Sequence, residues 1–374
     1  MTKKESILKF FLCGICACAL VFSLARPAVA AEAAFSALSL CARRVVPGVF
    51  LFMVAAKTFA ACGGARAFSR LTRGAFEKLF RVSESGAAVI FLGLLSGYPA
   101  GAAVAGEFIK SGTLSEREAE RILPFATAAS PAFLVASVGS MCGGARFGLI
   151  MLASQAASAL LLLLITRRSG VRAEERGFSR APARTLAAFT SAIKSSGASA
   201  LNICSFVTFF YVFSAMLFSL LPASLTHGFF GALISGLLEI SCGFARLGAL
   251  GAGQARFFCG GLMLGFGGFS VLLQSADAVG AEGVSMKKYL LGKTAQAFFT
   301  ALFSLLFGSL FGTAELSAVF FFPGEGKAQV GAIWQSCLLF LIFCSVFAGF
   351  LIFIIKILSL FKKIFKKLWK KNNL

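Results

Sequence analysis

Helix-breaking residues inside apolar runs are the positions in this sequence that could bind a ligand. Three such runs contain Ser96-Gly97-Tyr98-Pro99-Ala100-Gly101, Ser130-Pro131 and Gly265-Phe266-Gly267-Gly268. Proline and glycine interrupt a helix and free backbone N–H and C=O groups. In a membrane, free backbone groups are tolerated only inside protein or beside a water-filled cavity. The three breaks therefore predict an interior site, where the N-terminal ends of half-helices favour an anion.

Hydroxyls, an amide and one acid are the side chains that could line this site. Glu239 is the acid in the middle of an apolar run. Such an acid costs roughly 2.5–3.5 kcal/mol to insert, which favours a functional role; the structural alternative is a partner for a serine or a backbone group. Lys57 could join an anion site or reach the membrane surface. The predicted substrate-binding residues are Ser96, Gly97, Tyr98, Pro99, Gly101, Ser130, Pro131, Glu239, Gly265, Gly267, Gly268, Ser270 and Gln274.

The residue sets of common catalytic sites are missing from the sequence. His227 is the single histidine, so there is no Ser-His-Asp set and no H-E-x-x-H motif, and a G-x-x-x-x-G-K-[ST] loop is also lacking. Cys13, Cys16 and Cys18 form a C-x2-C-x-C run without the histidine or acidic partners of a metal site. We therefore expect no enzymatic activity, no cofactor and no metal ion.

The composition of the chain predicts which elements position these residues. Of the 374 residues, 58% are apolar and 14% charged, against about 25% charged in soluble domains. The net charge of +21 lies between apolar runs and at the C-terminus, which indicates cytoplasmic loops and no nucleic-acid partner. The sequence predicts an all-α polytopic protein of the bacterial cell membrane. Ten apolar runs have spanning length: 7–25, 45–61, 87–106, 122–139, 147–165, 199–221, 229–244, 257–273, 289–311 and 333–355.

Loop charges predict the topology. Arginine and lysine are abundant in 62–86, 166–198 and the C-terminal tail, and scarce in 222–228 and 312–332. The first three regions should be cytoplasmic and the other two external. Three apolar runs separate the two cytoplasmic loops, and three more separate the two external loops. One run of each set must enter and leave on the same side, which predicts two re-entrant elements.

Short motifs indicate an internal repeat. Leu95-Ser96-Gly97 recurs as Ile234-Ser235-Gly236, Arg121 as Arg256, and Ser154-Gln155-Ala156 as Ala295-Gln296-Ala297, at offsets of 139, 135 and 141. In the predicted topology the halves are inverted, which is typical of secondary transporters. The predicted division is 1–31 N-terminal membrane helix, 35–168 first repeat, 169–198 basic cytoplasmic loop, 199–315 second repeat, 332–356 last membrane helix and 357–374 basic amphipathic tail.

The two ends of the chain allow further expectations. Residues 1–31 could be a cleaved signal peptide, because Ala28-Val29-Ala30 resembles an A-x-A site, but a multi-pass protein favours an uncleaved first helix. The tail 357–374 alternates apolar residues with lysine pairs. Membrane lipids are therefore its expected partner, since such a segment lies on an anionic membrane surface.

Four motifs resemble a known family. S-G-Y-P-A-G-A at 96–102, A-S-P-A-F at 129–133, G-L-L-E-I at 236–240 and G-F-G-G-F-S-V-L-L-Q at 265–274 resemble the YlbJ-type sporulation integral membrane proteins. These belong to the nucleoside-recognition, or gate-domain, group. The resemblance covers about residues 25–315. It implies a gate-type fold and a role in moving dipicolinate from the mother cell towards the developing spore. Ala103 and Thr127-Ala128 stand where the family usually has lysine and asparagine, so polar groups of the expected site are lost.

The sequence thus predicts a secondary transporter of a small organic anion. By resemblance the anion is dipicolinate and the membrane is the one around the forespore. Two other functions stay open: a non-transporting scaffold of a sporulation or envelope complex, and a nucleoside-type transporter. A central cavity would favour transport, because a scaffold does not need broken, polar-lined helices.

Overall fold

The computed structural model describes residues 3–167, 185–251, 253–279 and 284–311, and all regular secondary structure in them is helical. The predicted last helix and tail, the 312–332 loop and most of the basic loop lie outside the described residues. The prediction of an all-α polytopic membrane protein is confirmed. Five described helical stretches are long and apolar enough to cross a membrane: Pro27–Ala61, Ala145–Ile165, Leu186–Leu220, Gln254–Val279 and Met286–Phe311.

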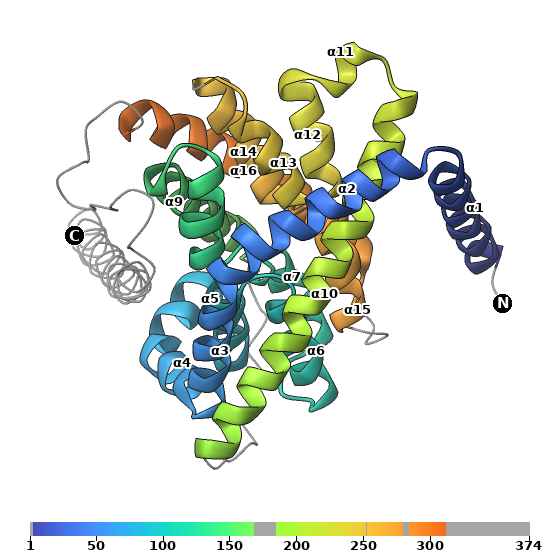
Figure 1. Cartoon of the computed structure of the whole chain (residues 1–374). Coiled ribbons are helices and arrows are strands. Elements are labelled where there is room, and N and C mark those ends of the chain that lie inside the picture. Colours follow the sequence, from blue (N-terminus) through green and yellow to red (C-terminus); the bar gives the residue numbers. More distant parts are fainter. Residues whose placement is uncertain (1–2, 168–184, 252, 280–283, 312–374) are drawn as a thin grey trace, which may run out of the picture.

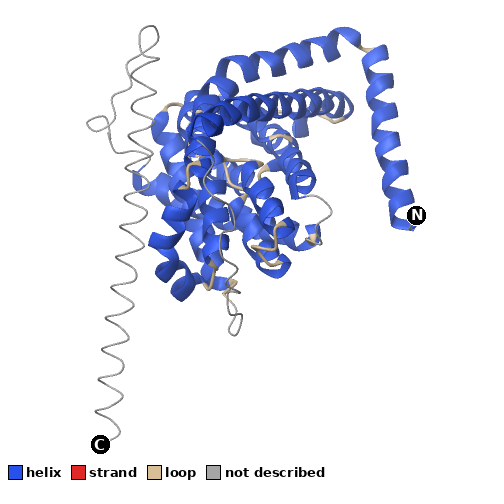
Figure 2. Ribbon diagram, turned by 90° about the horizontal axis from the view of Figure 1, so that it is seen from below, coloured by secondary structure: helices blue, strands red, loops and turns tan. Residues whose placement is uncertain are grey.

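The N-terminal helices differ from the expected division. Helix α1 (Lys3–Ala25) stands apart from the body (Figures 1 and 2). Helix α2 (Pro27–Leu40), the π-helical turn η1 (Cys41–Val45) and α3 (Val46–Ala61) then form one stretch of 35 residues. The expected boundary at 31–35 lies inside α2, because the alanine-rich segment after Pro27 has a high helix propensity.

A second long helix crosses this stretch. Helix α10 (Thr185–Leu220) has 36 residues and starts well before the apolar run that predicted it at 199–221. It contacts α2 and α3 and runs diagonally over the molecule in Figure 1. Lys57 of α3 donates to Ser199 Oγ of α10 at 2.9 Å. Lys57 therefore links two helices, and it is absent from the pocket described below.

Two helical hairpins have the form of the predicted re-entrant elements. The first joins α5 (Glu84–Ser96) to α6 (Ala100–Lys110), and the second joins α12 (Gly228–Leu238) to α13 (Ile240–Gly248). A Cβ built on Gly101 would lie 2.9 Å from the Cα of Gly93, and one on Gly243 would lie 2.3 Å from the Cα of Gly236. Residues seven or eight apart can approach so closely only where the chain turns back on itself.

Hydrogen bonds close the open ends of both hairpins. In the first, Ser85 Oγ donates to the Thr113 carbonyl at 2.9 Å. In the second, an Arg246 guanidinium N–H donates to the Thr226 carbonyl at 3.2 Å, next to the short helix α11 (Ala223–Thr226). The run 229–244 was expected as one apolar segment, and the structure folds it at Glu239.

A broken helix and a straight helix follow each hairpin. After the first hairpin, α7 (Glu116–Ala126) is interrupted at 127–130 and continues through η3 (Phe133–Val138) and α8 (Gly139–Met141) to the straight α9 (Ala145–Ile165). After the second, α14 (Gln254–Phe266), left-handed Gly267 and α15 (Gly268–Val279) lead to the straight α16 (Met286–Phe311). The order hairpin, broken helix, straight helix therefore occurs twice.

The two units have matching arginines and opposite orientations. Arg121 in α7 donates to the Phe80 and Arg81 carbonyls at 2.8 and 2.6 Å, beyond α4 (Gly64–Ala75) and η2 (Phe76–Phe80). Arg256 in α14 donates likewise to the Cys142 and Leu250 carbonyls. Figure 1 shows α5 and α6 in the lower half of the molecule and α12 and α13 in the upper half. The hairpins thus approach the centre from opposite sides, as inverted repeats do.

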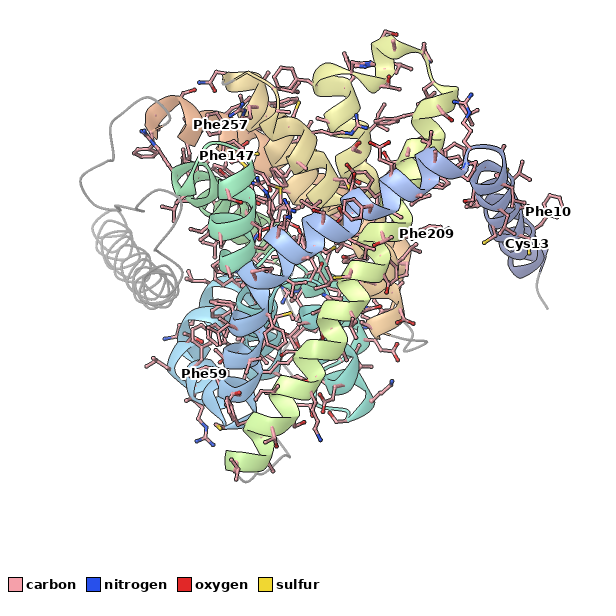
Figure 3. The ribbon with its side chains drawn as sticks, viewed as in Figure 1. Phe10, Cys13, Phe59, Phe147, Phe209 and Phe257 are labelled. Atoms are coloured by element: carbon pink, nitrogen blue, oxygen red, sulfur yellow. The ribbon has the colours of Figure 1, made fainter. Side chains whose placement is uncertain are left out.

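Small residues hold the centre together, while large apolar residues cover the outside. A Cβ on Gly265 would lie 2.4 Å from the Cα of Ala297, so α14 and α16 pack backbone to backbone. Phe147 of α9 and Phe257 of α14 stack with ring centroids 5.2 Å apart (Figure 3). Phe10 and Leu24 of α1 are each 83% exposed, and Figure 3 shows Phe10 on the outer side of α1. A lipid environment accounts for such exposure, since it solvates apolar side chains.

Candidate functional site

The tips of the two hairpins meet at one pocket in the centre of the molecule. Ser96, Gly97 and Tyr98 come from the first tip, and Glu239, Ile240 and Ser241 from the second. The pocket volume is about 50 Å³, which is room for a few water molecules. The remaining lining residues are Val45, Val49, Met53, Ser130, Phe133, Ile203, Val207, Val271 and Gln274.

The first tip packs on the break of its own repeat and bonds to the other repeat. Gly97 ends α5 with φ 77°, a left-handed conformation that favours glycine. A Cβ on Gly97 would lie 2.9 Å from Ser130 Cβ, so the tip touches the interruption after α7. Tyr98 OH donates to the Leu264 carbonyl of α14 at 3.1 Å. The three predicted breaks at 96–101, 130–131 and 265–268 therefore do meet.

The second tip places a carboxylate in the pocket wall. Glu239 is the residue between α12 and α13, with extended backbone at φ −148° and ψ 123°. Its Oε2 accepts the Cys242 N–H at 2.8 Å and so caps α13. The side chain is 3% exposed and lines the pocket. Glu239 thus makes the structural contact considered from the sequence and also faces the candidate site.

Two further polar side chains face the pocket from the broken helices. Ser130 Oγ accepts the Phe133 N–H at 3.2 Å and caps the helix that follows. Gln274 Nε2 donates to Ser270 Oγ at 3.0 Å. Gln274 Oε1 is buried and has no hydrogen-bond partner in the described structure. A buried oxygen without a partner costs about 1–3 kcal/mol, so a ligand or water that donates to it would be favoured.

The other predicted site residues lie around the pocket instead of in its wall. Gly101 and Gly265 allow close contact with Ala126 and Ala297, and Gly268 packs on the Gly236 carbonyl. These positions shape the breaks, because a side chain would hold the neighbouring backbone away. The predicted residues absent from the pocket wall are Pro99, Gly101, Pro131, Gly265, Gly267, Gly268 and Ser270.

Sequence reasoning missed two parts of the site. Part of the apolar wall comes from α3 and α10, each of which precedes one of the two hairpins, and no motif marks Val49 or Ile203. Lys293 of α16 is fully buried directly behind Tyr98, with Nζ 5.8 Å from the centre of the ring. A lysine within the apolar run 289–311 was a visible signal for it.

The two repeated glutamines differ in their contacts. Gln155 Oε1 accepts the Ala129 N–H and Gln155 Nε2 donates to the Ala129 carbonyl, both at 3.0 Å. Gln155 therefore replaces two helical hydrogen bonds that are lost at the break. Gln296 Oε1 accepts from Lys293 Nζ at 2.8 Å. Among the described residues, no group of three or more His, Cys, Asp and Glu could hold a metal ion.

The helical fold and the five apolar helical stretches of spanning length define a multi-pass integral membrane protein. Over 158 residues the chain is 29% identical to the sporulation integral membrane protein YlbJ of Bacillus subtilis (strain 168). The match spans 42% of this chain and only 38% of that relative. No family model and no solved structure matches the chain. The similarity agrees with the motif resemblance and covers less than half of the chain.

Proposed function

We propose that this protein is a secondary transporter of a small organic anion and that the central pocket is its substrate site. The observation that carries the proposal is the meeting of two hairpin tips, from opposite sides, over two broken helices. In such an arrangement each hairpin can act as the gate of one side. Movement of one tip at a time would give alternating access, the mechanism associated with inverted repeats.

Helix ends favour an anion in this pocket. The α13 helix begins at Ile240, and the helix after Ser130 also begins at the pocket wall. The N-terminal end of a helix carries a partial positive charge and free N–H groups. Hydroxyls of Ser96 and Ser241 can add hydrogen bonds to a carboxylate.

Glu239 links anion binding to a proton. An ionised carboxylate at the α13 N-terminus would repel an anionic substrate, because both would compete for the same positive end. A protonated Glu239 removes this repulsion and can donate to the substrate. The other titratable groups beside it in the described structure are the thiols of Cys41 and Cys242. Binding should therefore strengthen as the pH falls, and the anion would move together with a proton.

Dipicolinate is the anion to test first. The relative is named as a sporulation protein, and the motif resemblance implies movement of dipicolinate towards the spore. A planar dicarboxylate presents two anionic ends to a pocket with two helix N-termini. The membrane around the forespore is the location that this proposal implies.

Uptake by proteoliposomes tests the proposal. Purified protein is reconstituted, and labelled dipicolinate, other dicarboxylates and nucleosides are supplied in turn, with an inward proton gradient. We expect saturable uptake of dipicolinate that a protein-free control lacks. Ser205→Ala, which alters an exposed hydroxyl of α10, should transport like the unmodified chain. Uptake of nucleosides alone would indicate the nucleoside-type alternative, and folded protein without any uptake would favour the scaffold.

A further inference from the structure

The side-chain amino group of Lys293 is buried among neutral oxygen atoms. The side chain is 0% exposed. Nζ donates to Gln296 Oε1 at 2.8 Å, to the Thr127 carbonyl at 3.1 Å and to the Pro124 carbonyl at 3.5 Å. Within the described residues no carboxylate forms an ion pair with it. Three oxygens thus surround Nζ, which is the number that the three N–H donors of an ammonium can satisfy, and all three are neutral dipoles.

The oxygen atoms form a cradle at the end of a half-helix. Pro124 lies in the last turn of α7, and Thr127 follows its end. Carbonyls at a helix C-terminus have no helical partner and carry the negative end of the helix dipole. Carbonyls of this kind, at breaks in membrane helices, are the groups that coordinate sodium ions in transporters with broken helices. The three-oxygen cradle is therefore suited to a monovalent cation.

The repeat does not require a lysine at this position. Gln296 corresponds to Gln155 by the repeated Gln-Ala motif, and at the same offset Lys293 corresponds to Leu152. Gln155 hydrogen-bonds the N–H and the carbonyl of Ala129 at the break of its own repeat, and it carries no charge. The lysine of α16 instead crosses to the break of the first repeat and lies behind Tyr98, which lines the pocket. Lys293 thus has no charged counterpart in the first repeat and lies next to the proposed substrate site.

We propose that Lys293 is a built-in cation that fills a monovalent-cation site made by Pro124 O, Thr127 O and Gln296 Oε1. The ammonium takes the position that a sodium ion would otherwise occupy and joins the two repeats through it. Transport by this protein would then need no sodium. The cation site does not depend on which substrate the protein carries, because a measurement of protein stability can test the site without any substrate.

Truncation of the lysine should expose the site to ions from solution. In Lys293→Ala the oxygens remain and the ammonium is lost. We measure thermal unfolding of the purified variant in sodium, methylammonium or N-methyl-D-glucamine chloride at equal ionic strength. Sodium or methylammonium should raise the Tm of Lys293→Ala saturably over the bulky cation, because an ion that binds only the folded state stabilises it. Lys293→Met, which fills the space with an uncharged chain, and the unmodified protein should show no such rise.

Two results would overturn the proposal. One is an equal Tm of Lys293→Ala in all three salts, and the other is an equal response of Lys293→Met. If the alanine variant does not accumulate, a double-mutant cycle of Lys293→Met, Gln296→Leu and the double variant replaces it. Losses of Tm that are coupled support the cradle, and losses that add up contradict it. Replacing sodium with N-methyl-D-glucamine should leave uptake by the unmodified chain unchanged. A protein that transports nothing refutes the proposed function, while the Tm experiment still tests the cation site.

Discussion

At the scale of single residues, two of the polar side chains that line the pocket have different roles. Glu239 Oε2 caps α13 through Cys242 N–H, whereas Gln274 Oε1 is buried without a partner. A cap contributes about 1 kcal/mol to stability, whereas a buried oxygen without a partner lowers it. Substitutions at these two positions should therefore separate folding from ligand binding.

Glu239→Gln should fold and insert but lose the pH dependence of uptake. The glutamine oxygen can still accept the Cys242 N–H, so the α13 cap is preserved. The amide cannot be protonated, so uptake should no longer increase from mildly alkaline to acidic pH. The measurement is initial uptake across that range, with membrane accumulation followed by immunoblot. Unchanged pH dependence would mean that Glu239 is structural, and failure to accumulate would mean that its charge holds the hairpin.

Gln274→Leu should weaken substrate binding with little loss of stability. Leucine has a similar volume. It removes the buried oxygen that has no partner and also the amide that donates to Ser270 Oγ, so the gain and the loss of stability offset each other. We expect an increase of the uptake KM by about tenfold, equivalent to about 1.4 kcal/mol, and a Tm close to that of the unmodified chain. Gln155→Leu is the matched control: it leaves both polar groups of Ala129 unsatisfied and should lower the Tm clearly. A large Tm loss in Gln274→Leu, or an unchanged KM, would speak against a binding role.

At the scale of elements, glycines decide how closely the hairpin arms approach the broken helices. A Cβ on Gly93 or Gly101 would lie 1.8 or 2.0 Å from the Ala126 carbonyl oxygen, the last residue of α7. The obstacle is backbone, which cannot rotate away as a side chain can. The first hairpin therefore depends on these two positions to hold its tip at Ser130.

Gly101→Ala should destabilise the protein by about 1–3 kcal/mol, as overpacking of a core does. Gly197→Ala is its control, because it lies in α10 with nothing within 4 Å of the new Cβ. The control should be neutral or slightly stabilising, since alanine favours helix more than glycine. Thermal unfolding in detergent measures both. Equal Tm values for the two variants would contradict the close contact of the hairpin with α7.

At the scale of the whole molecule, the two hairpins and the loop charges describe the same topology. The open end of the first hairpin lies at Ser85 and Thr113, and Ser85 lies at the end of the basic region 62–86. The open end of the second lies at Thr226, in the uncharged loop 222–228. The loop charges therefore predict that the first open end faces the cytoplasm and the second faces outside.

Cysteine labelling in a Cys-free background tests this topology. Ser111→Cys, at the exposed open end of the first hairpin, and Arg176→Cys, in the basic loop, should react with an impermeant reagent only after the membrane is opened. Ser224→Cys, in the external loop, should react in intact cells. Labelling of position 176 only from outside would reverse the orientation. Labelling of 111 and 224 from one side would contradict the inverted hairpins.

The sequence by itself determined the class of the protein and the places where its helices break. Apolar runs of spanning length predicted the membrane fold, and Gly97, Ser130 and Gly267 marked three breaks. These features could be predicted because helix propensity and hydropathy are properties of short segments. The motif offsets and loop charges also predicted a repeat with two re-entrant elements, which agrees with the two hairpins.

Only the tertiary structure decided which groups face one another. The fold at Glu239, the wall from α3 and α10 and the cradle of Lys293 join residues that are far apart in the chain. Lys293 and Thr127 are separated by 166 positions, as are Tyr98 and Leu264. No local pattern specifies such partners, because a buried polar group is satisfied by whichever element packs against it. The partner becomes known only when the helices are placed in space.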